Sequence, residues 1–369
     1  MNVPKARIQS VDALRGLVMI IMALDHTRDF FHSAAPQFQP DDLTRTWAVL
    51  FFTRWITHFC APVFMFTAGL GAFLGNRSSG FLWRRGLWLV ILELTVLRLG
   101  YSFNFAGPPL LTILWALGWS MVALAVLMLL PRRVLVAVCV AGIGLHNLAD
   151  GAQVKGWFWS VLHRQGLIQV AGATAVVSYP LIPWIFVMAA GYCFGPVLRM
   201  EAVRRRRVLA VSGVVMSVAF VVIRAINLYG DPRRWGPPHL VLSFLRVTKY
   251  PPSLDFVLMT LGPALIWLAW ADGREFGKRN PLMVFGRVPL FYFLGHFYLL
   301  HVLAMVCAQV YYGHSWDLMN ILSPPRGYGY SLGAVYVAWA VVVVVMYPLC
   351  VWFAGVKERR REWWWLSYL

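Results

Sequence analysis

Charged residues are scarce in this 369-residue chain, where they make up only 13% of the sequence. Hydrophobic residues make up 60%, and the mean hydropathy is +0.65. This composition excludes an ordinary soluble protein and is typical of a chain with many membrane-spanning helices. The few charges are also unbalanced, since 33 Lys and Arg stand against 15 Asp and Glu. In so apolar a chain the basic excess indicates loops anchored at a membrane surface, so we expect no nucleic-acid partner.

The chain also lacks the common signatures of metal, nucleotide and serine-hydrolase sites. Its five cysteines are scattered without CxxC spacing, which indicates buried thiols and neither a disulfide framework nor a metal site. No GxSxG, HExxH, Walker A or GxGxxG sequence occurs in a supporting context. These absences exclude serine hydrolases, zincins, ATPases and dinucleotide-binding enzymes, and we predict no metal site.

Long apolar runs occur along the whole chain, and they predict an all-α polytopic membrane protein. We expect residues 1–369 to form a single transmembrane domain with about ten membrane-spanning helices. The expected helices cover residues 11–31, 48–74, 83–99, 109–130, 132–149, 177–198, 207–228, 253–271, 286–310 and 330–354.

Basic residues gather in alternate loops of this arrangement, for example at Arg84 and at 204–207. Because cytoplasmic loops carry the excess of Lys and Arg, this pattern predicts that both termini lie in the cytoplasm. The last residues, about 356–369, contain KERRREWWW and predict an interfacial tail at the lipid headgroups. On the outer side, residues 150–179 and 230–252 are expected to form long connections with ordered turns.

The first apolar segment, SVDALRGLVMIIMALDHTRDFFH (10–32), carries charges at both ends. Arg15 and His26 are eleven residues apart, so on an ideal helix they lie within about 20° of one face. The rise between them is roughly 16 Å, about half the hydrocarbon thickness of a bilayer. One stripe of one helix therefore carries a fixed cation near one membrane surface and an imidazole deep inside the membrane.

A histidine beside a carboxylate is the usual general base, because the carboxylate orients the ring and stabilises the imidazolium. Asp29 is three residues from His26 and shares its helix face, so we predict that Asp29 orients the ring. Asp25 points about 100° away from His26, and we expect it either to position a substrate or to pair with Arg54.

Other ionisable residues are predicted at a similar depth in neighbouring helices. Such groups are costly inside a bilayer, so each is expected to be either paired or functional. For Arg54 and Glu93 the simplest alternative is a structural ion pair. For His58 the alternative is a hydrogen bond between helices, and for Asp12 it is a contact that fixes the rotamer of Arg15. The residues predicted to shape a substrate site are Arg54, His58, Glu93, Asp255 and His296.

The opening RIQSVDALRGLVMIIMALDHTRDFFH resembles the bacterial membrane proteins grouped with heparan-α-glucosaminide N-acetyltransferase, within a wider set of transmembrane acyltransferases. That set is similar in having an arginine, ten residues and then a histidine on the first helix, here Arg15 and His26. Four further blocks resemble the bacterial branch: HFCAPVFMFTAGLGAFL (58–74), YPLIPWIFVMAAGYCFG (179–195), KYPPSLDFVLMTLG (249–262) and GRVPLFYFLGHFYLLH (286–301).

The resemblance implies an acetyltransferase of the bacterial cytoplasmic (inner) membrane. It would take acetyl groups from cytoplasmic acetyl-CoA and transfer them to a hydroxyl or amine of a sugar-type or glycan acceptor on the far side. The family histidine maps to His26. Lysosomal members have an asparagine at this position and a functional histidine in the next loop, for which His32 is the nearest residue here.

We therefore hypothesise a membrane acyltransferase in which His26 is the general base and Arg15, helped by other basic residues, binds the phosphates of acetyl-CoA, with Asp12 beside Arg15 in the cofactor site. Its partners would be the lipid bilayer, acetyl-CoA and a glycan acceptor, and a homodimer remains open. The alternative is a proton-coupled or anion transporter or flippase that uses the same intramembrane His, Asp, Glu and Arg residues. We find no repeated halves, which counts against a transporter. A third alternative is a scaffold with structural ion pairs.

Overall fold

The computed structural model describes residues 8–152, 154–315, 324, 327–360, 362–363 and 366, and in them the protein is mostly helical. The α-helices are α1 (Gln9–Phe31), α2 (Ala48–Ile56), α3 (Cys60–Leu74), α4 (Ser79–Leu92), α5 (Arg98–Ser102), α6 (Ile113–Leu127), α7 (Arg132–Gly144), α8 (Trp157–His163), α9 (Trp184–Phe194), α10 (Ala202–Ile226), α11 (Leu240–Leu245), α12 (Leu254–Ala271), α13 (Pro281–Arg287), α14 (Pro289–Tyr312) and α15 (Leu332–Arg359). Short helical turns are η1 (Thr57–Phe59), η2 (Glu93–Leu97), η3 (His146–Ala149) and η4 (Gly195–Arg199).

Every segment predicted to span the membrane contains a helix in the structure, and the predicted all-α class is confirmed as a mostly helical fold. The helical stretches that are long and apolar enough to cross a bilayer by themselves are Ala48–Leu74, Ala202–Ile226, Leu254–Ala271, Pro289–Tyr312 and Leu332–Arg359. The length and apolar character of these helices indicate an integral membrane protein. The number of ten spans stays a prediction, as does the single domain.

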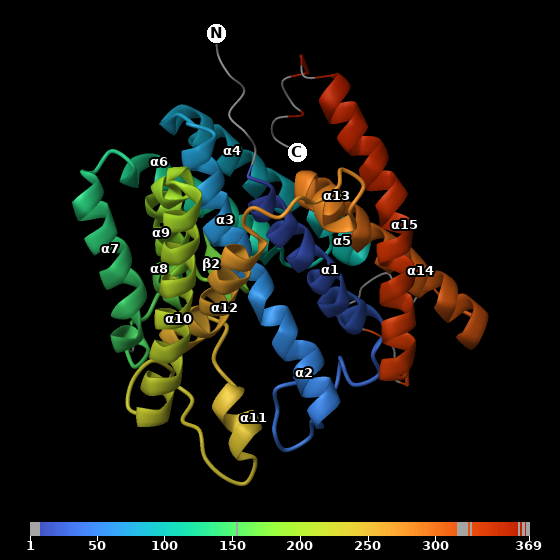
Figure 1. The fold of residues 1–369 in the computed structure, drawn as a ribbon. Helices are drawn as coiled ribbons and strands as arrows, with labels where there is room; N and C mark the ends of the chain where they lie inside the picture. The colour runs from blue at the N-terminus through green and yellow to red at the C-terminus, as the bar shows by residue number, and fades with distance from the viewer. Residues whose placement is uncertain are drawn as a thin grey trace.

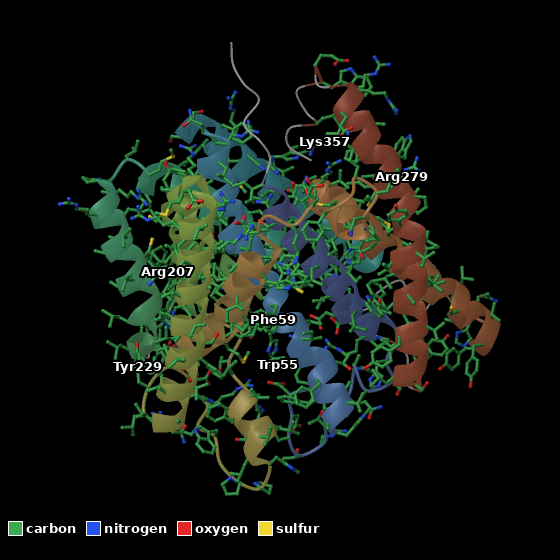
Figure 2. All side chains as sticks on the ribbon, in the orientation of Figure 1. Trp55, Phe59, Arg207, Tyr229, Arg279 and Lys357 are labelled. Carbon is green, nitrogen blue, oxygen red and sulfur yellow. The ribbon has the colours of Figure 1, made fainter. Side chains whose placement is uncertain are left out.

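The two ends of the helical bundle differ in their side chains. In Figure 1, α1 begins and α15 ends at the same, upper end of the bundle. Figure 2 labels Lys357 and Arg279 near this end and Tyr229 near the lower end. This arrangement agrees with the prediction that both termini share one side, and their cytoplasmic location stays a prediction. The predicted tail at 356–369 lies partly outside the described residues.

Residues 150–179, predicted as a long connection with ordered turns, also contain a helix and two strands. This segment contains α8 and a hairpin of β2 (Gly166–Val170) and β3 (Ala173–Val177), paired antiparallel with Gly166 opposite Val177. A short strand β1 (Leu110–Leu111) pairs parallel with β3 and completes a sheet in the order β1-β3-β2. Ala171 and Gly172 have φ values of 49° and 82°, which suit a two-residue hairpin turn. The sequence signal was two runs rich in β-branched residues separated by Ala-Gly.

An ion pair joins two loops that were predicted to lie on the outer side. Asp41, in the connection between α1 and α2, accepts a hydrogen bond from the guanidinium of Arg233, and Arg246 lies 3.7 Å from the same carboxylate. Burial alone would raise the pKa of Asp41, but the attraction of Arg233 outweighs it and lowers this pKa below its usual value. The predicted connection at 230–252 is thus held in place by charged contacts.

α1 lies at the centre of the fold, where it contacts α2, α3, α12, α13, α14 and α15 (Figure 1). Its contact with α13 is especially close because both helices present a glycine. A Cβ atom added to Gly16 would lie 1.8 Å from the backbone oxygen of Leu282, and one added to Gly286 would lie 1.8 Å from the backbone oxygen of Asp12. Small residues at such positions let two helix backbones approach within a membrane.

We expect Gly16→Ala to destabilise the protein by about 1–3 kcal/mol, because the new methyl group forces the backbones of α1 and α13 apart. Gly80→Ala is the matched control, since an added Cβ there meets no atom within 4 Å and Gly80 is exposed. The measurement is the thermal unfolding midpoint in detergent. Equal midpoints for the two variants would contradict the proposed close packing.

Candidate active site

A cavity of about 280 Å³ lies between the helices α1, α3, α4, α6 and α14. Arg15, Met19 and Met22 line it from one face of α1, as the helical spacing predicts. Its other lining residues are Phe64, Thr67, Ala68, Gly71 and Ala72 of α3; Arg77; Phe81, Leu82, Arg85 and Leu89 of α4; Ile113, Leu114, Leu117 and Met121 of α6; and Pro289, Leu290 and Phe293 of α14. The cavity is therefore largely apolar and carries three arginines.

The three arginines of the cavity come from different parts of the chain. Arg77 follows the end of α3, Arg85 lies in α4, and Arg15 lies near the start of α1. Arg15 donates a hydrogen bond to the backbone oxygen of Thr67, and its guanidinium lies 3.9 Å from the carboxylate of Asp12. The expected contact between Asp12 and Arg15 is thus confirmed. The guanidinium groups give one part of the cavity a positive potential that suits an anion.

His26 lies one turn beyond Met22 on α1, and it forms a histidine pair with His296 of α14. Nδ1 of His26 is 2.8 Å from Nε2 of His296, and Nδ1 of His296 is 2.9 Å from the backbone oxygen of Tyr292. Because a carbonyl oxygen only accepts, Nδ1 of a neutral His296 carries its proton and its Nε2 accepts from His26. Nε2 of His26 is then left without a proton, as a general base requires.

Aromatic rings enclose this pair and connect it to the cavity. The ring of Phe293, which lines the cavity, lies 6.0 Å from the ring of His26 between centroids. Phe297 lies 5.2 Å from His26 in the same edge-on manner. His296 is fully buried, whereas His26 is only half-buried. The half-buried imidazole of His26 is therefore not itself part of the cavity lining, and it lies behind the ring of Phe293, which is.

The structure corrects the prediction that an aspartate on α1 orients His26. Asp29 contacts Arg28 at 2.6 Å, and its side chain is 50% exposed. Asp25 forms ion pairs with Arg28, at 2.8 Å, and with Arg54. Among the described residues, the side chain at hydrogen-bonding distance from the ring nitrogens of His26 is His296. The helix face placed Asp29 near His26, but its carboxylate turns outward to the guanidinium of Arg28.

Glu93 has a different partner from the one expected. Its carboxylate accepts hydrogen bonds from the backbone N–H groups of Thr112, Leu114 and Trp115 and from the hydroxyl of Thr112. It therefore caps the N-terminus of α6, where the first N–H groups have no partner within the helix and favour a negative charge. The suggested ion pair between Arg54 and Glu93 is wrong, while the alternative pair of Arg54 with Asp25 is confirmed.

The remaining predicted residues lie in three separate places. His58 is buried and packs against the ring of Phe256 at 5.3 Å between centroids. His32 ends α1, and its Nδ1 accepts a hydrogen bond from the backbone of Ala34 at 3.2 Å. Asp255 is buried 3.8 Å from Arg224, in a cluster that supports the loop at 230–252. Of the predicted site residues, only Arg15 belongs to the described lining of the cavity, and His26, His32 and Asp255 do not.

The predicted site residues do not include Lys249, a buried cation in the same part of the molecule. Lys249 is buried, with 9% of its surface exposed, and it lies within electrostatic reach of Asp25, His26 and His58. Its neighbour Tyr250 donates a hydrogen bond to the hydroxyl of Tyr179 at 3.2 Å. The available signal was the KYPPS segment, which stands directly before α12 and belongs to one of the resembling blocks, but no role was predicted for its lysine.

Residues 7–229, more than half of the chain, match the profile of a family described as heparan-alpha-glucosaminide N-acetyltransferase, catalytic. The match includes α1, α3, α4 and α6, which supply most of the cavity lining, and it includes His26. No curated protein sequence matches the chain.

Proposed function

The chain belongs to the heparan-alpha-glucosaminide N-acetyltransferase family, and from this membership we propose that it transfers an acetyl group from acetyl-CoA to a sugar-type acceptor. The acceptor would offer a hydroxyl or an amine on the outer side of the membrane. The observation that carries this proposal is the cavity that joins a cluster of arginines to the neighbourhood of His26. In this proposal one path would connect an anion-binding region with a proton acceptor.

The residues of the cavity fit acetyl-CoA in both charge and shape. Arg15, Arg77 and Arg85 would contact the phosphates, because guanidinium groups bind phosphate through two parallel hydrogen bonds. The cavity volume of about 280 Å³ is at the lower limit of small-molecule pockets, so the cavity would hold the narrow pantetheine arm of acetyl-CoA. The nucleotide would then lie outside the cavity, near Arg77. Arg15 and His26 are separated by roughly 16 Å along α1, a span that such an arm can bridge.

Acetyl-CoA supplies an acyl carbon bonded to a thiolate leaving group. In the proposed reaction, Nε2 of His26 accepts the proton of the acceptor hydroxyl or amine while the new bond to the acyl carbon forms. The carbon–sulfur bond then breaks, and His26 returns the proton to the leaving thiolate. His296 keeps Nδ1 of His26 as a hydrogen-bond donor throughout, which fixes the ring orientation.

The geometry favours His26 over His32 as the base. His32 is buried at the end of α1, and its Nδ1 already accepts a backbone hydrogen bond. His26 is half-buried beside the cavity and has a ring nitrogen left to accept a proton. Lys249 and Asp25 would contribute the remaining charges around the acceptor, together with Arg54 and His58.

The test is acetyl transfer by the purified protein in liposomes. Labelled acetyl-CoA is supplied on one side, and amino sugars or glycosides with free hydroxyls are supplied on the other. Label should appear on an acceptor only with protein present, and acetyl-CoA should raise the thermal unfolding midpoint. Mass spectrometry of envelope glycans from cells with and without the protein would identify the natural acceptor by one acetyl mass. The proposal would be rejected if the protein showed no acetyl transfer and acetyl-CoA did not stabilise it.

Arg15→Gln should raise KM for acetyl-CoA about tenfold with a smaller change in kcat, because it removes a charged hydrogen bond to phosphate that forms on binding. Arg84→Gln is the control, since Arg84 is exposed at the same end of the bundle and is absent from the cavity lining. Steady-state kinetics at varied acetyl-CoA measure both variants. An equal KM for Arg15→Gln and Arg84→Gln would exclude Arg15 from the donor site.

A further inference from the structure

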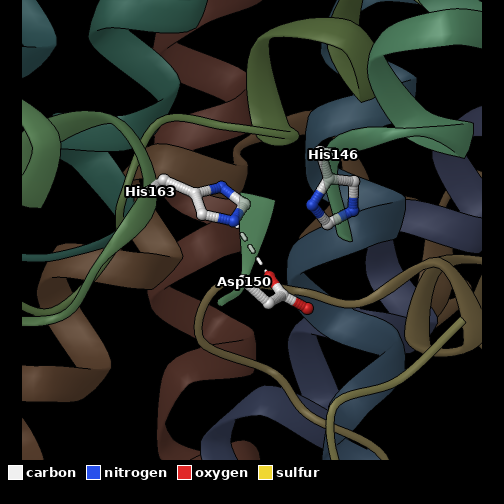
Figure 3. Close-up of side chains that lie close together, drawn as sticks. All are labelled: His146, Asp150 and His163. Carbon is white, nitrogen blue, oxygen red and sulfur yellow. Dashed lines mark hydrogen bonds and ion pairs between the residues drawn. The ribbon is translucent and has the colours of Figure 1, made fainter. Parts of the chain in front are cut away.

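Two histidines and an aspartate gather outside the cavity and outside the His26 pair (Figure 3). His146 begins the turn η3, Asp150 follows that turn, and His163 ends α8. One nitrogen or carboxylate oxygen from each residue lies within 4.8 Å of the others. Nε2 of His163 is 2.9 Å from Oδ1 of Asp150, and the two imidazole rings are 5.5 Å apart between centroids.

His146 is the unexplained member of this cluster. Only 8% of its surface is exposed, and neither of its ring nitrogens has a hydrogen-bond partner among the residues that the structure describes. Buried polar groups normally have partners, so an orphaned imidazole in this position indicates a missing ligand. Figure 3 shows a ring nitrogen of His146 facing the space beside Asp150 and His163.

The carboxylate of Asp150 is held by a second layer of contacts. The side-chain amide of Asn147 donates to Oδ2 of Asp150 at 2.7 Å, and the oxygen of the same amide accepts from the backbone of Leu254 at 2.9 Å. Asn147 thus ties the cluster to the first turn of α12. Such supporting hydrogen bonds are typical of metal sites, where they orient the ligands.

We propose that His146, Asp150 and His163 bind one zinc ion. Two imidazoles and one carboxylate form a common zinc ligand set, and water would complete a tetrahedral site. Calcium and magnesium prefer oxygen ligands, so the two imidazoles favour a transition metal. If Nε2 of His163 binds the ion, the proton that Nε2 shares with Asp150 moves to Nδ1 of the neutral ring, which leaves Nε2 and the carboxylate free to bind the metal. The ion would fasten α8 to the turn after α7.

The sequence contains no known zinc spacing, so from the residues alone no metal site is expected. His146 and Asp150 are four residues apart, but His163 is thirteen residues beyond Asp150 and comes close to them only because the chain folds back. The pattern contains neither paired cysteines nor HExxH, so it stands out only once the fold brings α8 against η3.

The experiment uses the full chain in detergent after treatment with a chelator and removal of the chelator. Zinc is then added, and bound metal is measured by mass spectrometry after desalting. We expect about one zinc per wild-type chain, and a thermal midpoint that rises with zinc concentration. His163→Ala and Asp150→Asn should lose at least tenfold in zinc affinity, whereas His239→Ala, which removes an exposed histidine, should bind zinc normally.

Cobalt keeps the proposal testable if a variant fails to fold. Cobalt(II) added to the wild-type protein should give the visible absorption of a tetrahedral site, and zinc should abolish it by competition. Less than a tenth of an equivalent of zinc on the wild-type chain, or equal zinc affinity in wild type and Asp150→Asn, would overturn the proposal. None of these readouts depends on acetyl transfer.

Discussion

Replacing His26 with alanine should lower kcat for acetyl transfer by about 10²–10⁴-fold, the range expected when a general base is lost. The physical reason is that Nε2 of His26 is the proton acceptor left available by the hydrogen bond from its Nδ1 to His296. His26 makes no ion pair within hydrogen-bonding distance among the described residues, but its removal leaves Nε2 of the buried His296 without its partner. We therefore expect a stability loss of about 1–3 kcal/mol beside the much larger loss of turnover.

Single-turnover and steady-state assays of His26→Ala and His32→Ala separate the two candidate bases. His32 ends α1 and bonds the backbone of Ala34, so its replacement should affect stability more than chemistry. His239→Ala controls for the loss of any histidine. If His32→Ala abolishes transfer while His26→Ala retains it, the assignment of the base moves to His32. The hydrogen bond between His26 and His296 would then have no role in catalysis.

The parts of the site that lie on one helix could be predicted from the sequence. Helical periodicity fixes the faces of Arg15, Met19 and Met22, and the structure has all three along the same cavity. The confirmed contact of Asp12 with Arg15 follows from the same spacing. The ion pair of Asp25 with Arg54 was one of two alternatives, because a charge inside a bilayer requires a partner and helix α2 supplies one at similar depth.

Contacts between distant segments could not be predicted in this way. His26 and His296 are separated by 270 positions, and their hydrogen bond depends on how α14 crosses α1. A periodic pattern gives the face of each helix but not the neighbour that this face meets. Glu93 shows the same limit, since its carboxylate fits the four donors at the start of α6 better than the single cation expected. Lys249 lies in the loop before α12, and periodicity does not predict which loop residues are buried.

Asp25→Ala should destabilise the protein by about 3–5 kcal/mol, the cost of breaking a buried ion pair from one side. Asp25 lies between the guanidinium groups of Arg28 and Arg54, and their side chains are only 4% and 13% exposed. Without the carboxylate, two cations face each other in a region of low dielectric constant, where their repulsion is poorly screened. The thermal or denaturant-induced unfolding of the detergent-solubilised protein measures this effect.

Asp29→Ala is the matched control, because Asp29 contacts the same Arg28 but its side chain is 50% exposed. An ion pair that remains in contact with solvent contributes only about 0–1 kcal/mol, so this variant should unfold near the wild-type midpoint. A second variant, Asp25→Ala combined with Arg54→Met, should recover part of the lost stability, because it removes one of the uncompensated cations. Equal destabilisation by Asp25→Ala and Asp29→Ala would mean that water reaches both carboxylates. In that case the charged network beside His26 would be a hydrated substrate surface, and its aspartate would act on the acceptor and not on the fold.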